Sequence, residues 1–215
     1  MRPLTFTNER NEAALQAATV FVVDDDADVR RSLSLLVRSV NLRVETFSSA
    51  NDFLSSYEPL RPGCLVLDVR MPGMTGLELQ KELGSHAVEL PIIFVSAHGE
   101  IPMVSQSLRA GALDFVQKPY SPQAMLERIH EAIEQDDRTR REKAQRHEVD
   151  QRLAQLSDRE REVMCLLAEG MSTKSIASHL AISSKTVDNH RARIFEKIQV
   201  ENTAELARLI YSTIR

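Results

Sequence analysis

Four strand-like runs in the first half of the chain each stop at polar or charged residues, and this repeat constrains the fold most strongly. The residues at which the runs stop are Asp24-Asp25-Asp26, Asp68, Ser96 and Lys118. Short apolar runs bounded by turn residues, such as Pro72-Gly73, are typical of buried parallel strands. Because the carboxyl ends of parallel strands meet at one edge of a sheet, we expect these side chains to gather there.

Strand-like and helix-like segments alternate from Thr19 to about Gln135. The expected strands are 19–24, 42–46, 64–68, 92–96 and 114–117. The expected helices are 27–40, 50–57, 75–84, 101–110 and 121–135. This alternation predicts an α/β domain over 19–135, in which helices cover both faces of a doubly wound parallel sheet. The preceding residues 1–18 are polar with little periodicity, so we expect a loose extension there.

Charged residues dominate the next segment, where acidic residues stand four positions before basic ones. The pairs are Glu134–Arg138, Asp136–Arg140, Asp137–Arg141, Glu142–Arg146 and Glu148–Arg152. Each such pair stabilises an exposed helix by about 0.2–0.5 kcal/mol. We therefore predict that the preceding helix continues as a helical linker over 136–155, with a partly frayed linker as the alternative.

Beyond the linker the pattern is entirely helical and predicts a second, all-α domain over 156–215. Ser157 and Glu160 have the spacing of a capping box that opens one helix, and Gly170 ends it. A short helix from Ser172, a turn at 181–183 and a longer helix over 184–197 have the layout of a helix-turn-helix. A last helix is expected from about residue 202.

The longer helix has a polar face suited to DNA. That face is formed by Lys185, Asp188, Asn189 and Ala192, whereas Val187, Ile194 and Ile198 point elsewhere and are expected in the core. Lys185, Arg191, Arg193 and Lys197 can reach phosphates. An acid on the reading face should repel phosphate, so Asp188 implies either recognition of cytosine N4 or no direct contact.

Composition indicates the cellular compartment of the chain and the partners that it can bind. The net charge of −4 gives no global signal for nucleic acid, although a local basic stripe suffices for DNA binding. Cys64 and Cys165 fall in separate predicted domains, so each is expected to be a small core residue in a reducing compartment. No apolar stretch has the ~20 residues of a membrane span, and the amino terminus lacks a signal-peptide core. We expect a cytoplasmic protein with no membrane partner.

The residues at the strand ends are suited to phosphoryl transfer. Mg²⁺ takes hard oxygen ligands and keeps several waters, so Asp25 and Asp68 suffice to hold it, with Asp24 in support. An aspartate oxygen can attack a phosphoryl group, and the metal would screen the crowded carboxylates from it. Lys118 would pair with the phosphoryl oxygens, and Ser96 would donate a hydrogen bond to them. A cis peptide before Pro119 would aim Lys118 inward.

These residues resemble the receiver domain of bacterial two-component response regulators. The motifs that carry the resemblance are Val23-Asp24-Asp25, Asp68-Val69-Arg70-Met71-Pro72-Gly73, Ser96-Ala97, Gly111-Ala112 and Lys118-Pro119. The turn after Asp68 and the segment His98-Gly99-Glu100 are similar to the FixJ subfamily. The resemblance implies a flavodoxin-like sheet of strand order 2-1-3-4-5, with Asp68 as the phosphoacceptor. It also implies Mg²⁺ held by Asp24, Asp25, Asp68 and the backbone carbonyl of Arg70, a switch pair of Ser96 and Phe115, and Lys118 as a phosphate contact.

Residues 156–211 resemble the LuxR/FixJ-type DNA-binding domain. The motifs are the run from Leu156 to Val163, Ser175-Ile176-Ala177, and Ser183 followed by Thr186-Val187 and His190. The residues expected at the DNA are Lys185, Thr186, Asp188, Asn189, His190, Arg191, Arg193 and Lys197.

Together the two resemblances imply a response regulator of the FixJ/NarL type. A sensor histidine kinase would phosphorylate Asp68, and a homodimer would form through the helix over 101–110 and the last strand. The dimer would bind promoter DNA and activate transcription by RNA polymerase, with no enzymatic activity beyond slow autodephosphorylation. One alternative is a phosphohydrolase with Asp68 as nucleophile, but Arg70 stands where haloacid-dehalogenase-type phosphatases carry a second acid. Another is a phosphoryl sink or adaptor that binds proteins instead of DNA.

Overall fold

A computed structural model of the chain describes the backbone of residues 9–97 and 111–213. Two compact units are present, Met1–Arg140 and Arg141–Arg215. The described helices include none that is both long enough and apolar enough to cross a bilayer.

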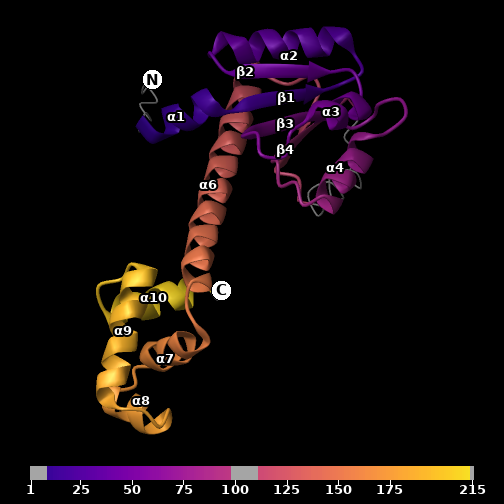
Figure 1. The fold of residues 1–215 in the computed structure, drawn as a ribbon. Coiled ribbons are helices and arrows are strands. Elements are labelled where there is room, and N and C mark those ends of the chain that lie inside the picture. The colour runs from indigo at the N-terminus through magenta and orange to yellow at the C-terminus, as the bar shows by residue number, and fades with distance from the viewer. Residues whose placement is uncertain (1–8, 98–110, 214–215) are drawn as a thin grey trace. The chain divides into compact units, whose positions relative to one another are not determined.

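A five-stranded parallel sheet forms the centre of the first unit, in the order β2-β1-β3-β4-β5 (Figure 1). The strands are β1 (Thr19–Val23), β2 (Arg43–Phe47), β3 (Gly63–Asp68), β4 (Ile92–Ser96) and β5 (Asp114–Gln117). Each bound lies within one residue of the prediction, and the strand order is the one that the resemblance implied. The central strands β1, β3 and β4 are buried along their whole length because helices cover both faces of the sheet.

The helices of this unit divide between the two faces. Their bounds are α2 (Ala27–Ser39), α3 (Ala50–Ser56), α4 (Gly76–Ser85) and α6 (Pro122–Ala154). On one face Leu33 of α2 and Ile129 of α6 pack with Val66 of β3. On the other face Phe53 of α3 and Leu79 of α4 pack with side chains of the same strand that point the opposite way. The expected helix 101–110 lies outside the described residues.

The amino-terminal extension corrects one expectation, because Glu9–Ala17 form a helix, α1. Leu15 packs against the core cluster on the α2 face, and Arg43 Nη2 donates to the carbonyl of Gln16 at 2.6 Å. The prediction of a loose segment over 1–18 is therefore wrong for this stretch. The apolar periodicity was too weak to reveal the helix because alanines occupy most of its apolar positions.

The helix α6 is continuous over 33 residues, which confirms the predicted helical linker. Ion pairs among those predicted include Asp136–Arg140 at 2.7 Å and Glu148–Arg152 at 2.6 Å. The first compact unit extends to Arg140, beyond residue 135, at which the α/β domain was expected to end. The physical reason is that Asp136, read as an exposed linker residue, is buried against the start of β3.

The second unit has the predicted layout of helices, α7 (Asp158–Ala168), α8 (Thr173–His179), α9 (Ser184–Ile198) and α10 (Thr203–Thr213). Both halves of the predicted Ser157–Glu160 capping box are present. Val187, Ile194 and Ile198 of α9 are buried in the core, as predicted. Cys64 is buried in the first unit, but Cys165 is exposed, so the prediction of a core residue is wrong there. The reason is that α7 buries the face of Val163, Met164 and Leu167.

Candidate functional site

The carboxyl edge of the sheet brings three charged side chains into direct contact, as predicted. Lys118 Nζ donates to Asp24 Oδ2 at 2.7 Å and to Asp68 Oδ1 at 3.0 Å. Asp24, which follows β1, is 2% exposed, and Asp68, at the end of β3, is 8% exposed. One lysine therefore bridges two buried carboxylates that lie 44 positions apart in the sequence.

Backbone groups hold each of these residues in place. Asp24 Oδ1 accepts from the amide of Asp26 at 2.9 Å, and Asp68 Oδ2 accepts from the amide of Arg70 at 2.8 Å. The amide of Lys118 donates to the carbonyl of Ser96 at 2.8 Å, which fixes the end of β5 against β4. The peptide between Lys118 and Pro119 is cis, as predicted.

One residue at this edge that the sequence did not single out is Arg30 of α2. Its Nη1 donates to the backbone carbonyl of Asp24 at 2.7 Å and so fixes the turn after β1. The sequence carries only a weak signal for this role, because an arginine on an amphipathic helix is most often a solvated side chain.

Gly76 lets the first turn of α4 approach the end of β3. A Cβ atom at this position would lie 2.3 Å from the carbonyl oxygen of Asp68, which is closer than any real contact. A complete capping box of Thr75 and Glu78 spans this position and opens α4. Any larger residue would displace either the helix or the strand end that carries Asp68.

Negative charge is in excess at this edge. Burial, together with the nearby charge of Asp24, raises the pKa of Asp68 above its usual value, although the hydrogen bond from Lys118 opposes this. For Lys118 burial acts to lower the pKa, but the hydrogen bonds and charges of Asp24 and Asp68 outweigh it and raise the pKa. One ammonium group thus pairs with two carboxylates. The remaining negative charge would attract a further cation, either free or bound to a phosphoryl donor.

The other predicted receiver residues lie in or next to the strands that carry this contact. Asp25 is exposed next to Asp24, and the side chain of Arg70 is exposed next to Asp68. Ser96 is 3% exposed at the end of β4. Phe115 in β5 is half-buried, has Phe94 as its Cα partner across the strands, and packs against the core cluster on the α4 face.

The oxygen donors at this edge decide whether Mg²⁺ fits there. Among the described residues, no three His, Cys, Asp or Glu side chains cluster closely enough to bind a metal by themselves. Mg²⁺ needs only one or two carboxylates, because it keeps most of its waters and accepts backbone carbonyls. Two buried carboxylates that share one cation fit such an ion.

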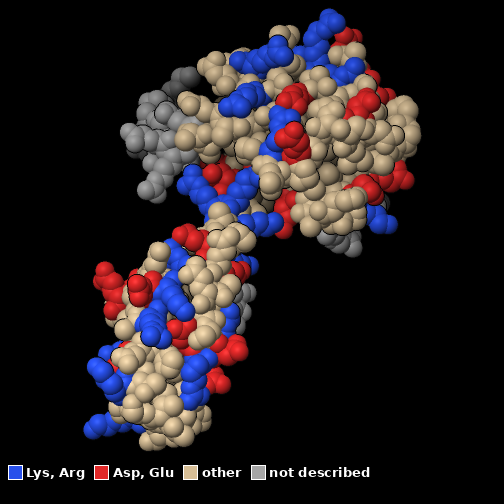
Figure 2. Space-filling view, viewed as in Figure 1, with Lys and Arg blue, Asp and Glu red and all other residues tan. Residues whose placement is uncertain are grey.

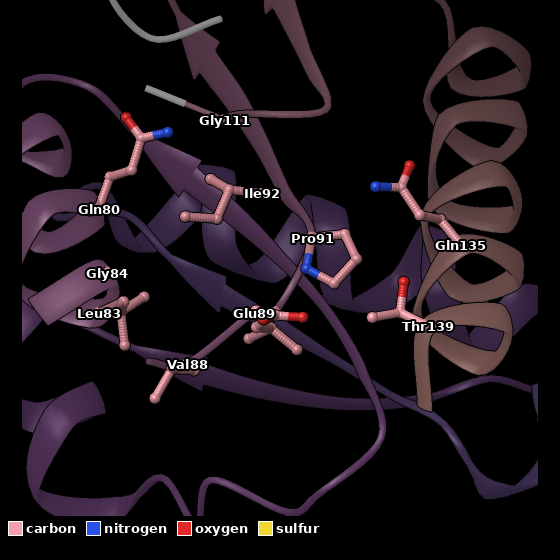
Figure 3. Close-up of a pocket in the computed structure, with 11 residues that line it drawn as sticks. Gln80, Leu83, Gly84, Val88, Glu89, Pro91, Ile92, Gly111, Gln135 and Thr139 are labelled. Carbon is pink, nitrogen blue, oxygen red and sulfur yellow. The ribbon is translucent and has the colours of Figure 1, made fainter. Parts of the chain in front are cut away.

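A separate hollow of about 330 Å³ lies at the opposite, amino-terminal edge of the sheet (Figure 3). Gln135 and Thr139 of α6 face it from one side, and Leu83 of α4 lies on the other. It contains none of the charged residues of the carboxyl edge, so the phosphoryl chemistry predicted from the sequence is not located there.

In the second unit, α9 presents the predicted polar face. Lys185, Asn189, Ala192 and Arg193 are exposed, while Thr186, Asp188, His190, Arg191 and Lys197 are half-buried. Basic side chains gather along α9 in the space-filling view (Figure 2). Asp188 Oδ1 lies 3.4 Å from Arg191 Nη2, so the acid on this face has a basic neighbour one turn away. His190 Nδ1 is buried and makes no hydrogen bond within the described part of the chain.

Lys197 differs from the other basic residues predicted at the DNA. Its Nζ donates to Glu160 Oε2 at 2.7 Å and to the carbonyl of Gln155 at 3.1 Å. These bonds hold the last turn of α9 to the capping box of α7. The sequence could not reveal this contact because the two partners lie 37 positions apart.

Comparison with protein-family models gives two matches that together span most of the chain. Residues 20–130 match the response regulator receiver domain. Residues 154–210 match the bacterial regulatory proteins of the luxR family.

Individual relatives align over both units. The transcriptional regulatory protein TdiR of Thauera aromatica is 44% identical over 198 residues, which cover 90% of this chain and 86% of TdiR. The transcriptional regulatory protein FixJ of Azorhizobium caulinodans is 38% identical, with 90% of this chain and 92% of FixJ covered. Among solved structures, the response regulator StyR has a TM-score of 0.85 and 41% identity, with 91% of this chain and 99% of StyR covered. Full-length FixJ from B. japonicum has a TM-score of 0.58 and 36% identity, with 91% and 97% covered.

Proposed function

The chain belongs to the bacterial two-component response regulators that join a receiver to a LuxR-type DNA-binding domain, and we propose that phosphorylation of Asp68 controls its binding to promoter DNA. The observation that carries the proposal is the bridge from Lys118 Nζ to both Asp24 and Asp68. The relatives are transcriptional regulators and not enzymes of the classical kind, so the phosphohydrolase alternative receives no support.

Asp68 is the proposed phosphoacceptor because its carboxylate lies at the strand end beside both a cation and a second acid. A phosphohistidine of the sensor kinase gives up its phosphoryl group, so that a P–N bond breaks and a P–O bond to the Asp68 carboxylate forms. Lys118 then pairs with the new phosphoryl oxygens, and Ser96 Oγ donates a hydrogen bond to them. Mg²⁺ would be held by Asp24, Asp25, Asp68 and the carbonyl of Arg70, and its charge would offset that of the crowded carboxylates.

The proposed switch follows from a change in the hydrogen bonds at Ser96. A phosphoryl group on Asp68 favours the state in which Ser96 is drawn toward it and Phe115 is buried more deeply. This shift would stabilise a homodimer of the receiver. The surface predicted for that dimer, the helix over 101–110, lies outside the described residues.

The residues of α9 fall into two proposed classes of DNA contact. Asn189 is exposed on the polar face and can make a bidentate contact to adenine. Lys185, Arg191 and Arg193 can reach phosphates, with Thr186 and His190 at the edge of the contact. Arg191 has an alternative partner in Asp188, whereas Lys197 is proposed to support the fold because Glu160 engages its ammonium group.

The proposal is tested by measuring DNA affinity with and without a small phosphodonor and Mg²⁺. The probe is a duplex that the wild-type protein selects from a random-sequence pool, and a random duplex of the same length is the control. Phosphorylation is expected to tighten binding to the selected duplex and to shift the protein toward a dimer in sedimentation. In Asp68→Asn the phosphodonor should change neither the DNA affinity nor the sedimentation. Equal affinity before and after full phosphorylation would contradict the proposal, and binding to no duplex would favour the adaptor alternative.

The two classes of contact on α9 separate by their dependence on sequence and salt. Asn189→Ala should cost about 1–3 kcal/mol on the selected duplex and relax the preference at one base pair. Arg193→Ala should weaken both duplexes alike and reduce the salt slope by about one unit. Equal loss on both duplexes for Asn189→Ala would exclude base reading by this residue.

A further inference from the structure

We propose that Arg152, in the last turn of α6, is a positioning residue for DNA reading, because it holds the carboxyl end of the recognition helix α9. The inference rests on the proposed role of α9 at the DNA. It extends the functional DNA-binding unit to a residue that precedes the match to the luxR-family model, which begins at residue 154.

The contact joins the guanidinium of Arg152 to the last residue of α9. Arg152 Nη1 donates to the carbonyl of Ile198 at 3.2 Å, and its Nη2 donates to Glu148 Oε1 at 2.6 Å on the same face of α6. The Arg152 side chain is only 24% exposed, so packing as well as the two hydrogen bonds restricts it.

Ile198 is a position at which a cation has a defined effect. The last carbonyls of a helix have no partner within the helix, and the helix dipole places partial negative charge on them. Gln199, which follows, has a left-handed backbone with φ of 61°, so the chain leaves α9 at this point. Arg152 therefore both satisfies a carbonyl and neutralises the carboxyl end of α9.

A second contact ties the neighbouring residue of α9 to the same segment. Lys197 Nζ donates to the carbonyl of Gln155 and to Glu160 Oε2, while Leu153 and Leu156 pack on the core of the second unit. The end of α6 and the chain that follows it thus contact the last turn of α9 through the cations of Arg152 and Lys197, and two leucines fix the same segment to the core.

The expected consequence is a loss of specificity more than a loss of affinity. Asn189 lies more than two turns before Ile198, so a change in the tilt or rotation of α9 alters where Asn189 points. A bidentate hydrogen bond to a base edge depends on orientation, whereas long basic side chains adjust to reach a phosphate. Releasing the carboxyl end of α9 should therefore weaken reading of the preferred sequence more than general binding to DNA.

The experiment compares three full-length variants on the selected and the random duplex. Arg152→Met removes both the charge and the donors, Arg152→Lys keeps a charge and a donor, and Arg146→Ala removes one exposed positive charge from the same helix. Arg152→Met is expected to lose about fivefold in affinity for the selected duplex, with little change on the random duplex. Arg152→Lys should recover most of that loss. Arg146→Ala should leave the ratio of the two affinities unchanged.

The same variants distinguish a loss of stability from a change in the position of α9. Each affinity is measured below the unfolding temperature and corrected for the fraction of active protein, so that instability alone leaves the ratio of the two affinities unchanged. An unchanged ratio of affinities in Arg152→Met, or failure of Arg152→Lys to restore it, overturns the inference. A wild-type protein that does not prefer the selected duplex would instead overturn the proposed function on which the inference rests.

Discussion

A buried aspartate lies at each end of strand β3, and the two differ in how their charges are paired. At the carboxyl end, Asp68 is part of the strand itself. At the amino end, the amide of Gly63 donates to Asp136 Oδ2 of α6 at 2.9 Å. Asp68 is 8% exposed and Asp136 is 4% exposed, so burial does not distinguish them.

The carboxylate of Asp136 has a cation of its own. Arg140 Nε donates to Asp136 Oδ2 at 2.7 Å, and the two other nitrogens of Arg140 donate to the carbonyls of Leu60 and Arg61 at 2.9 and 2.7 Å. Asp136 Oδ2 and all three guanidinium nitrogens of Arg140 are paired, and the contact fastens α6 to the loop before β3. We interpret Asp136 as a structural residue.

The carboxylate of Asp68 shares its cation with Asp24. Lys118 divides its ammonium group between the two acids, and burial keeps the pKa of Asp68 raised. The pairing of a buried acid, more than its burial, therefore separates a structural site from a reactive one. Such incomplete neutralisation suits the phosphoryl acceptor that we propose at Asp68.

The largest expected effect is on stability, at the amino end of β3. Asp136→Ala leaves the amide of Gly63 and the guanidinium of Arg140 without their buried partner, and breaking such a pair costs about 3–5 kcal/mol. The free energy of unfolding of the receiver, measured in urea, should fall by that amount. Asp150→Ala, an exposed acid on the same helix, is the control and should change it by at most about 0.5 kcal/mol. A loss as small as that of the control would mean that Asp136 is not a structural anchor.

Replacing aspartate by asparagine at either end of β3 should change the free energy of unfolding differently. Asp136→Asn removes the charge that Arg140 needs and should lower the free energy of unfolding by about 2 kcal/mol. Asp68→Asn removes a carboxylate that is crowded by Asp24, so stability should stay the same or rise in the absence of Mg²⁺. Chemical unfolding of both variants at neutral pH measures the difference. Destabilisation of equal size at both ends would break the comparison.

A smaller effect is expected in the DNA-binding unit, where Glu160 repeats the paired arrangement of Asp136. Hydrogen bonds from Lys197 and Ser157 lower the pKa of Glu160 to about 2. A lowered pKa means that the ionised form stabilises the fold above the ordinary value of 4.5, and that this stabilisation is lost as the pH falls toward about 2. The difference in stability between wild type and Glu160→Gln should therefore narrow over that range. Acid unfolding of the two proteins measures it, and a constant difference would argue against the ion pair.

The carboxyl edge could be predicted from the sequence and the amino edge could not. The acids and the lysine of the carboxyl edge each lie at the end of a strand-like run, so local pattern and parallel topology together place them. The contact of Asp136 with Gly63 joins residues 73 positions apart, and Asp136 also fits an exposed pair with Arg140 four residues on. For the same reason Lys197 resembled a phosphate contact, since its partner Glu160 is distant in sequence. The segment around Leu15 has no clear apolar periodicity, so only the structure reveals that Leu15 packs against the core.

The most direct test of the contrast is the phosphorylation of three proteins side by side. Wild type, Asp68→Asn and Asp136→Asn are incubated with a labelled small phosphodonor and Mg²⁺, each at a temperature where it is folded, and uptake of label is measured. We expect Asp136→Asn to take up label like the wild type and Asp68→Asn to take up none. Label on Asp68→Asn equal to that on the wild type would contradict the assignment of Asp68 as the reactive acid.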